Sequence, residues 1–114
     1  MLKTNNEFEP MKIALVTSCL AGVAHSKMAA VALTKEAQKR GHSIAVEEQG
    51  GHKIPTKLTA EQIDEAEVVI IAKMVTISGK NRFEGKPILD VSVNKAVRDP
   101  SLIMDQAEQL IQLS

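Results

Sequence analysis

The sequence lacks a second cysteine, an excess of either charge and a long apolar run. With one cysteine the chain has no intrachain disulfide, which suits a reducing cytoplasm and leaves the thiol as a small core residue or a reactive group. Basic and acidic side chains number 14 each, whereas proteins that bind nucleic acid or membrane surfaces usually carry excess Lys and Arg. No apolar run approaches the roughly 20 residues of a membrane span, and the start, Met1 to Met11, lacks the apolar centre of a signal peptide. We therefore expect a cytoplasmic protein with no nucleic-acid partner and no direct membrane insertion.

The length and the apolar fraction suit one domain. A chain of 114 residues that is 44% apolar can bury roughly two thirds of its unfolded surface without a disulfide or a structural metal. Residues 1–10 mix Asn, Glu, Lys and Thr without apolar periodicity. We expect them to form a flexible N-terminal segment that precedes a single domain over residues 11–114.

Four segments have the composition of strands. Lys12 to Ser18 is a short, nearly continuous apolar run, which is typical of a strand covered on both faces. Ser43 to Glu47 alternates as a second strand, which Gln49 to His52 ends. Val68 to Ala72 is the most convincing buried strand, and Ile88 to Val91 is the fourth.

Helical signals lie between and after these strands. One helix starts near Ala24 and is closed by Lys39-Arg40-Gly41, where cations suit the helix dipole and glycine suits a left-handed residue. A capping box at Thr59, with Gln62 three residues on, predicts a short helix to about Ala66. Asp99-Pro100 opens the last helix. The predicted apolar faces are Met28, Val31 and Ala32 for the first helix and Ile103, Ala107, Leu110 and Ile111 for the last.

The alternation of strands and helices predicts the fold class. It indicates an α/β fold of three layers (αβα), with a four-stranded, mostly parallel sheet and helices on both of its faces. In such sheets the functional site usually lies beyond the carboxyl ends of the strands, where the strand order reverses. The loop that begins at Cys19, after the first strand, lies at such an end.

The segment Cys19 to Ser26 runs from this strand end into a helix start and consists mostly of small residues. Its backbone N–H groups and those of the first helical turn have no intrahelical partners, so they can converge on a phosphate. Gly22 permits a positive φ, and Ala21 and Ala24 have little bulk, so the backbone can wrap closely around a tetrahedral anion. The same donors favour the thiolate form of Cys19. We hypothesise a thiolate nucleophile that accepts a phosphoryl group, followed by a phosphate loop that holds it.

Other interpretations of this segment stay open. A cysteine near a strand end is also common as a small buried hydrophobe. The spacing of Cys19, five loop residues, His25 and Ser26 is close to the phosphatase pattern, in which an Arg stands where His25 does. The guanidinium fork of that Arg holds two phosphate oxygens, and an imidazole cannot reproduce this bidentate geometry. We therefore favour a phosphocysteine that is passed on rather than hydrolysed.

The segment from Val16 to Ala30, VTSCLAGVAHSKMAA, resembles the phosphorylation loop of the fructose-type enzyme IIB of the bacterial phosphoenolpyruvate-dependent sugar phosphotransferase system (PTS). The resemblance covers about residues 11 to 110. Further matching segments are Glu48-Gln49-Gly50 after the second strand, Leu58-Thr59 at the next helix start, and Arg82-Phe83 with Gly85-Lys86 before the fourth strand.

The resemblance implies that residues 11–114 form a single IIB domain. In that family the cysteine at the position of Cys19 takes a phosphoryl group from a phosphohistidine on enzyme IIA and passes it to a sugar bound to the membrane component, enzyme IIC. The implied partners are therefore IIA and IIC, and no cofactor is implied. The implied phosphate-binding residues are Leu20, Ala21, Gly22, Val23, Ala24, His25 and Ser26.

Two places depart from the family's pattern. The family usually has Pro and then Thr directly after the cysteine, and here these are Leu20 and Ala21, so a hydroxyl near the phosphate is lost. The family's acidic residue after the third strand is replaced by Met74. These changes suggest a fructose-like paralogue and leave the sugar open.

The three histidines have different interpretations. His25 is favoured as a phosphate donor over a plain helix N-terminal residue, because it lies in the loop. His42 and His52 are expected to be solvated turn residues. Cys19 and the three histidines lack regular ligand spacing, so no metal site is expected.

The remaining candidates have structural interpretations. The segment Gln49 to Gly51 either lines the cleft beside the cysteine loop or forms a plain turn. We expect Arg82 to pair with Glu84 at the surface. Met28 and Met104 are expected to fill the core.

Three functions compete at this point. The leading one is a phosphoryl carrier that moves phosphate from a IIA partner through Cys19 to a fructose-like sugar on a IIC partner. The second is a low-molecular-weight phosphatase or arsenate reductase, which predicts turnover of an aryl phosphate or of arsenate. The third is a regulatory module that senses phosphorylation, which predicts a long-lived phosphocysteine that sugar and IIC cannot discharge.

Overall fold

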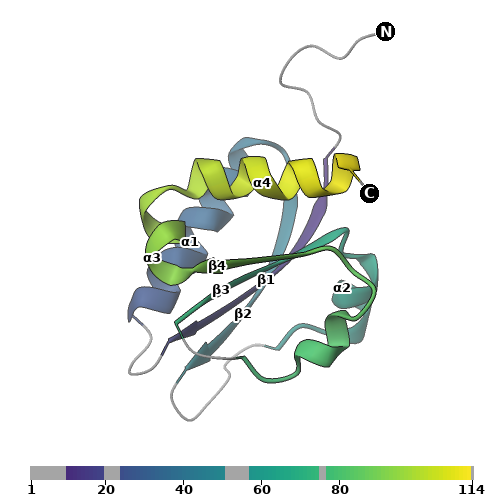
Figure 1. The fold of residues 1–114 in the computed structure, drawn as a ribbon, viewed down its shortest axis with the longest axis horizontal. Coiled ribbons are helices and arrows are strands. Elements are labelled where there is room, and N and C mark those ends of the chain that lie inside the picture. The colour runs from purple at the N-terminus through teal and green to yellow at the C-terminus, as the bar shows by residue number, and fades with distance from the viewer. Residues whose placement is uncertain (1–9, 20–23, 51–56, 75–76, 114) are drawn as a thin grey trace, which may run out of the picture.

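The computed structural model describes residues 10–19, 24–50, 57–74 and 77–113. Of the predicted flexible segment, residues 1–10, only Pro10 lies among them. In chain order the elements are β1 (Lys12–Cys19), α1 (Ala24–Lys39), β2 (Ser43–Gly50), α2 (Ala60–Glu65), β3 (Val68–Lys73), the 3-10 helix η1 (Lys80–Phe83), β4 (Ile88–Ser92), α3 (Val93–Arg98) and α4 (Pro100–Leu113) (Figure 1).

The strands form one parallel sheet in the order β2-β1-β3-β4. The chain passes from β1 to β2 on one side and then returns to place β3 on the other side of β1 (Figure 1). The strand order therefore reverses beside β1. This confirms the predicted fold class and puts the carboxyl end of β1, at Cys19, where ligand sites of such sheets usually form.

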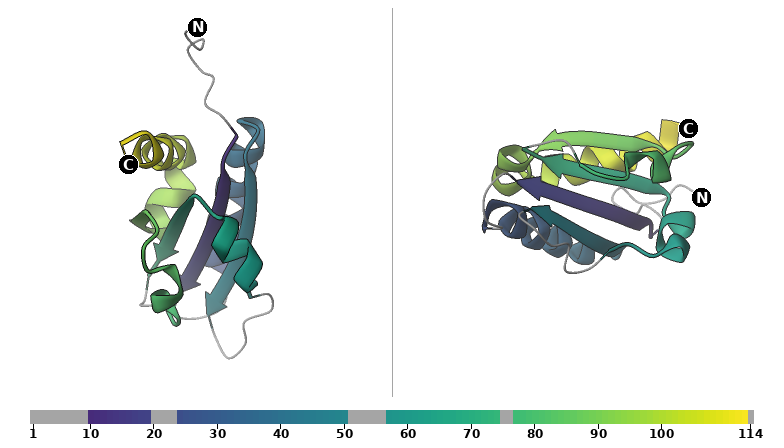
Figure 2. Two further views of the ribbon diagram at one scale, coloured as in Figure 1. Left: turned by 90° about the vertical axis from the view of Figure 1, so that its right-hand side faces the viewer. Right: turned by 90° about the horizontal axis from the view of Figure 1, so that it is seen from below.

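Two apolar cores lie on the two faces of the sheet, which confirms three layers. Helices α1, α3 and α4 cover one face of the sheet. There, Leu15 and Ile70 of the strands belong to the same core as Leu33 of α1 and Ile103 of α4. The intervening strand positions face α2 and η1, where Phe83 is fully buried. Figure 2 shows α2 across the sheet from α1. Because successive side chains of a strand point to opposite faces, strands buried on both faces read as continuous apolar runs.

The buried face of α1 differs from the prediction. Met28 is 52% exposed and Val31 is 47% exposed, so the predicted apolar face of this helix is wrong. Small residues pack against the sheet instead, because a helix lined with alanines can approach the strands closely. Among the α1 side chains that the structure describes, the buried ones are Ala29, Ala30, Leu33 and Ala37. Met104 in α4 is buried, as predicted.

The helix ends follow local rules. Thr59 Oγ1 accepts a hydrogen bond from the Gln62 N–H at 3.0 Å, and Gln62 Oε1 accepts one from the Thr59 N–H at 2.9 Å, so the capping box is confirmed. Gly41 closes α1 with a φ of 85°. Asp99 precedes α4, and its carboxylate accepts from the Leu102 N–H at 3.4 Å.

Helix α3 was not predicted from the sequence. Ser92 ends β4 and also caps α3, since its hydroxyl accepts a hydrogen bond from the Lys95 N–H at 3.1 Å. Val93 and Ala96 are the buried residues of this short helix. Two buried side chains in six residues are too few for a periodic signal, so the helix depends on packing against α1 and α4.

His42 is buried, so its prediction as a solvated turn residue is wrong. Its Nδ1 accepts a hydrogen bond from the Met11 N–H at 3.0 Å. Its Nε2 lies 2.8 Å from a carboxylate oxygen of Glu108 in α4. The ring therefore joins the start of β1 to the last helix. His52 lies outside the described residues.

Candidate functional site

The carboxyl end of β1 lies in the centre of the sheet. Cys19 is the last residue of β1 and pairs in register with Gly50, the last residue of β2. On the other side, the N–H of Met74, the residue after β3, donates a hydrogen bond to the Ser18 carbonyl at 2.8 Å. Three strands therefore end together around Cys19.

Helix α1 starts at Ala24, so four residues separate it from the end of β1. Ala24, His25 and Ser26 form its first turn, where backbone N–H groups have no intrahelical acceptors. A short connection from a central strand to a helix start is the arrangement that many anion sites use. Of the other predicted phosphate-binding residues, Leu20, Ala21, Gly22 and Val23 lie outside the described residues.

A hydrogen-bonded network supports the neighbouring end of β2. Gln49 pairs in register with Ser18, so it belongs to the strand and not to a plain turn. Its amide oxygen accepts from the Ser78 N–H at 2.8 Å, and its amide nitrogen donates to the Ser78 carbonyl at 3.1 Å. The same nitrogen donates to Glu47 at 2.7 Å. Gln49 therefore ties β2 to the segment that follows β3.

Arg82 completes this network through Glu47. Its two terminal nitrogens donate to the two carboxylate oxygens of Glu47 at 2.9 and 3.0 Å, a bidentate ion pair. The predicted surface pair of Arg82 with Glu84 is therefore wrong. Because 35 residues separate Arg82 from Glu47, no local spacing signals the contact.

Glu47 is ionised despite complete burial of its side chain, which is 0% exposed. Burial alone would raise the pKa of this carboxyl, but hydrogen bonds from Arg82, Gln49 and the Leu58 N–H together lower the pKa below its ordinary value. The Leu58 bond is 2.9 Å long. Charge-assisted hydrogen bonds thus connect β2 to η1 and to Leu58, which lies shortly before α2.

Gly79 is required by this network. It has a φ of 73°, and a Cβ at this position would lie 2.6 Å from Nε of Arg82. The Gly79 carbonyl also accepts a hydrogen bond from this Nε at 2.7 Å. Glycine therefore allows the guanidinium to lie over its own loop while it reaches Glu47.

The network lies on the α2 side of the sheet. Glu47 and Gln49 alternate with Val46, which packs on the α1 side, so both lie on the α2 side. Because α1 packs on the other side, the network supports the end of β2 from the face of the sheet opposite α1.

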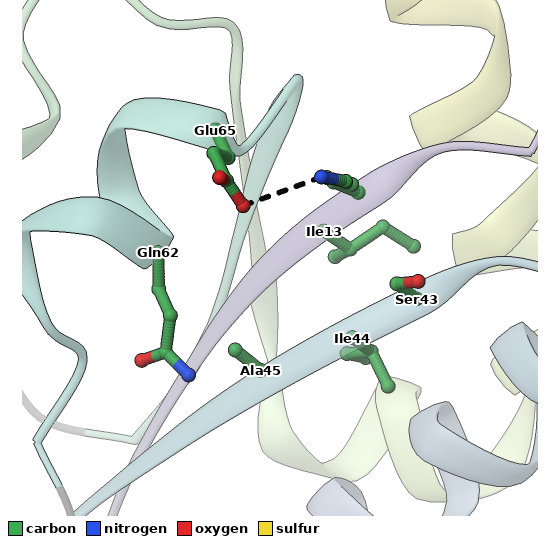
Figure 3. A pocket seen from close by; sticks show the side chains of 7 residues that line it. Ile13, Ser43, Ile44, Ala45, Gln62 and Glu65 are labelled. Carbon is green, nitrogen blue, oxygen red and sulfur yellow. Dashed lines mark hydrogen bonds and ion pairs between the residues drawn. The ribbon is translucent and has the colours of Figure 1, made fainter.

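A separate hollow of about 310 Å³ lies near the other end of the sheet. Figure 3 shows it between β1, β2 and α2. Lys12 and Glu65, which both line it, form an ion pair with an N–O distance of 3.3 Å. The residues that line it are Lys12, Ile13, Ser43, Ile44, Ala45, Gln62 and Glu65. The strand residues among them lie at the amino ends of β1 and β2, at the opposite end of β1 from Cys19, so this hollow is not the predicted site.

No helix within the described ranges is long and apolar enough to cross a membrane. Within the same part of the chain, no group of three or more His, Cys, Asp or Glu side chains is arranged to hold a metal ion.

The fold and the strand order define the class of protein. This is an α/β domain that presents a cysteine at the end of a central parallel strand, shortly before the start of a long helix. Residues 14–112 match the family model described as PTS system, Lactose/Cellobiose specific IIB subunit.

Individual relatives point the same way. The chain is 41% identical over 97 residues to the PTS system fructose-like EIIB component 2 of Escherichia coli strain K12, covering 85% of this chain and 92% of that protein. It is 41% identical over 95 residues to the PTS system 2-O-alpha-mannosyl-D-glycerate-specific EIIABC component of the same strain, covering 83% of this chain and 14% of that protein. A crystal structure of a domain from the fructose-specific IIABC component of Borrelia burgdorferi has a TM-score of 0.83 and 42% identity, covering 89% of this chain and 96% of that domain.

The chain belongs to the enzyme IIB family of the sugar phosphotransferase system, as its sequence predicts. Its function is that of a phosphoryl carrier component in sugar uptake, with a phosphotransferase role. Membership of this family implies IIA and IIC components as partners.

Proposed function

We propose that the domain accepts a phosphoryl group from a phosphohistidine of enzyme IIA onto the sulfur of Cys19 and passes it to a fructose-like sugar bound by enzyme IIC. The observation that carries this proposal is the position of the chain's single cysteine, at the end of the central strand β1 and five residues before the start of α1. Family membership supports the donor and the acceptor.

The chemistry consists of two displacements at phosphorus. In the first, the Cys19 thiolate attacks the phosphoryl group, a P–S bond forms and the P–N bond breaks, and the imidazole leaves with a proton from solvent. In the second, a sugar hydroxyl attacks, a P–O bond forms and the P–S bond breaks, and the hydroxyl proton leaves to a base. Such transfers need in-line positioning and charge stabilisation more than covalent chemistry by other side chains.

The backbone supplies the charge stabilisation in this proposal. The N–H groups of Ala24, His25 and Ser26 lie in the first turn of α1, where the helix dipole favours an anion. The segment from Leu20 to Val23 contributes the remaining amides, and the side chains of His25 and Ser26 are further donors. The carrier therefore needs no cofactor.

The sugar is proposed as fructose-like. One relative is named for a fructose-like system and one solved domain for a fructose-specific component. Another relative with the same identity is named for a mannosyl-glycerate system. Since similar IIB sequences occur in systems for different sugars, we assign the choice of sugar mainly to IIC.

Intact-mass analysis tests the carrier role. The protein is incubated with phosphoenolpyruvate, enzyme I, the histidine phosphocarrier and a fructose-type IIA, and Cys19→Ser and Ser18→Ala are treated in parallel. We expect one phosphoryl adduct on the natural protein and on the Ser18→Ala control, and none on Cys19→Ser. An adduct that persists in Cys19→Ser would contradict the assignment of the nucleophile.

A second stage tests delivery to sugar. Membranes that contain the cognate IIC, with fructose added, should remove the adduct and produce sugar phosphate. A long-lived adduct that these membranes cannot discharge would support the regulatory module instead. Steady release of inorganic phosphate without sugar would support the phosphatase.

A further inference from the structure

Exposed apolar side chains gather near the carboxyl end of β1. Met28 and Val31, each about half exposed, lie in the second turn of α1, the helix that starts shortly after this strand. Met74, which is 48% exposed, directly follows β3, where its N–H bonds the Ser18 carbonyl. Single exposed apolar residues are normal on a protein surface, whereas a group of them beside a candidate site marks an interaction surface.

The exposed face of α1 is basic as well as apolar. At about 3.6 residues per turn, the exposed positions share roughly one third of the helix circumference, and the buried alanines lie on the other side. The exposed residues among the described side chains of α1 are Lys27, Met28, Val31, Lys35, Gln38 and Lys39.

The positive charge of this face is not compensated. Within the described part of the chain, Lys27, Lys35 and Lys39 make no side-chain hydrogen bond and no ion pair. The acidic residue of α1, Glu36, is 14% exposed and pairs with Arg40 at 2.8 Å, so it does not neutralise them. A chain with equal numbers of basic and acidic side chains thus carries a local basic stripe.

A protein that reaches Cys19 must also cover the first turns of α1. A specific interface takes about 800 Å² of each partner, and a circle of that area extends about 16 Å from its centre. With a rise of about 1.5 Å per residue, positions 27 to 35 lie about 4 to 17 Å along the helix from Ala24, whereas Lys39 lies about 22 Å away. A partner centred on the end of β1 therefore reaches about as far as Lys35.

We propose that Lys27, Met28, Val31 and Lys35 form a docking face for an acidic, partly apolar surface of the phosphohistidine donor, enzyme IIA. This inference rests on the proposed function for the identity of the donor, and it adds the surface that the donor binds. An apolar centre with charged residues around it is the usual composition of such interfaces. The lysines also increase the rate of encounter with an acidic partner.

Charge favours IIA over two other occupants of the α1 docking face. Cytoplasmic loops of membrane proteins carry an excess of Lys and Arg, so the membrane component IIC would repel this face. Helices that lie on anionic membranes bury a broad apolar side with Trp, Phe or Leu. In α1 the apolar side that contains Leu33 is buried against the sheet, which leaves Met28 and Val31 exposed.

Isothermal titration calorimetry with an unphosphorylated fructose-type IIA tests docking without phosphoryl transfer. We expect the double variant Lys27→Gln with Lys35→Gln to raise the Kd about tenfold, because two intermolecular charge pairs are lost. Met28→Gln with Val31→Gln should raise it by a similar factor through lost apolar burial. All four positions are exposed, so thermal unfolding should match that of the natural protein.

Lys12→Gln with Lys39→Gln is the matched control. It removes the same charge from the start of β1 and from the last turn of α1, both outside the reach of the proposed partner. Its Kd should stay within about twofold of the natural value. Raising the salt concentration from about 0.05 M to about 0.5 M should weaken binding of the natural protein much more than binding of the Lys27 and Lys35 variant.

The rate of phosphorylation at increasing concentrations of phosphorylated IIA separates docking from chemistry. Both docking-face variants should raise the KM for IIA about tenfold and keep the natural maximal rate. A lower maximal rate with an unchanged Kd would overturn the inference, because the substituted residues would then act on the transfer step.

Absence of binding by the natural protein, or an unchanged Kd in both docking-face variants, would overturn the inference as well. Normal phosphorylation of those variants by IIA would then leave the proposed function standing. Sedimentation with vesicles of anionic phospholipid provides a further test. Vesicle binding that the lysine variant loses, with its affinity for IIA unchanged, would assign the face to a membrane. Binding of IIA that the variants weaken, without any adduct on Cys19 of the natural protein, would instead reject the proposed function and keep the docking face.

Discussion

Glu47 is a carboxylate that the fold buries completely and surrounds with donors. Two N–H groups of Arg82, the Gln49 amide and the Leu58 N–H all point at its two oxygens. A buried charge of this kind depends on its partners, since removing one partner leaves the other uncompensated in a poorly solvated place. The pair therefore controls both local stability and its response to acid.

Arg82→Met should destabilise the protein at pH 7 by about 3–5 kcal/mol, because it leaves the Glu47 carboxylate buried without its cation. Urea unfolding followed by circular dichroism measures the change. The double variant Arg82→Met with Glu47→Gln is the control, and it should recover part of the loss since no charge stays buried. A loss below about 1 kcal/mol, the range of an exposed pair, would contradict this view of the pair.

The pair of Glu47 and Arg82 also determines how the stability of the protein changes at acidic pH. The pKa of Glu47 in the folded protein lies below its ordinary value of 4.5. Glu47 thus contributes stability that is present above pH 4.5 and is lost as the pH falls toward the folded pKa. In Arg82→Met, burial without the cation raises this pKa, so the contribution of Glu47 to the free energy of unfolding should increase as the pH falls from 7 to about 5. Comparison with Glu47→Gln over this range isolates the contribution, and the same slope in both variants would contradict it.

At the scale of elements, α2 shows how a short helix is stabilised at both ends. None of its six residues is buried, so packing of its own side chains contributes little. The capping box of Thr59 and Gln62 satisfies its first turn. At the other end, the Lys86 ammonium donates to the carbonyls of Asp64 and Ala66 at 2.7 and 2.9 Å. These caps hold the α2 layer over the sheet.

Lys86→Met should lower the free energy of unfolding by about 1–2 kcal/mol, because it keeps most of the apolar stem and removes the two charge-assisted hydrogen bonds at the end of α2. Denaturant unfolding measures the loss. Lys95→Met, on α3, is the matched control, since its side chain is exposed, and it should change stability by less than about 0.5 kcal/mol. Equal effects of the two substitutions would show that Lys86 does not cap the helix.

At the scale of the whole molecule, a buried polar network joins distant parts of the chain. His42 bonds both the Met11 N–H at the start of the sheet and Glu108 in α4. Because its Nδ1 accepts, the ring is the tautomer that carries hydrogen on Nε2 and donates it to Glu108. Arg40 adds bonds to Glu36 and Glu108 at 2.8 and 2.9 Å. Burial alone would lower the pKa of Arg40, but these carboxylates, with Asp105, raise it above its usual range.

His42→Leu should destabilise the protein by about 2–4 kcal/mol, because it leaves the Met11 N–H unpaired and removes a donor from buried Glu108. Glu108→Gln, which keeps an oxygen for the histidine, should cost less. Thermal unfolding followed at several wavelengths measures both. A smaller loss in His42→Leu than in Glu108→Gln would contradict the assigned role of the ring.

Local signals in the sequence are sufficient for much of this protein. Apolar runs predict the four strands, because a strand buried on both faces must be apolar throughout, and Thr59, Gln62 and Gly41 predict helix ends from neighbours at most four residues away. The loop motif around Cys19 predicts the family, since its residues are consecutive in the chain.

Contacts between residues far apart in the chain were decided only by the tertiary structure. Arg82 reaches Glu47 across 35 residues, and His42 reaches Glu108 across 66. The buried face of α1 depends on how closely its alanines approach the sheet, and the spacing of apolar residues along the helix does not determine that distance. That the exposed Met28, Val31 and Met74 lie near one end of the sheet likewise becomes visible only once the strands and helices are assembled. The physical reason is common to all four: each follows from which surfaces meet when the layers pack, whereas periodicity and capping depend only on neighbours along the chain.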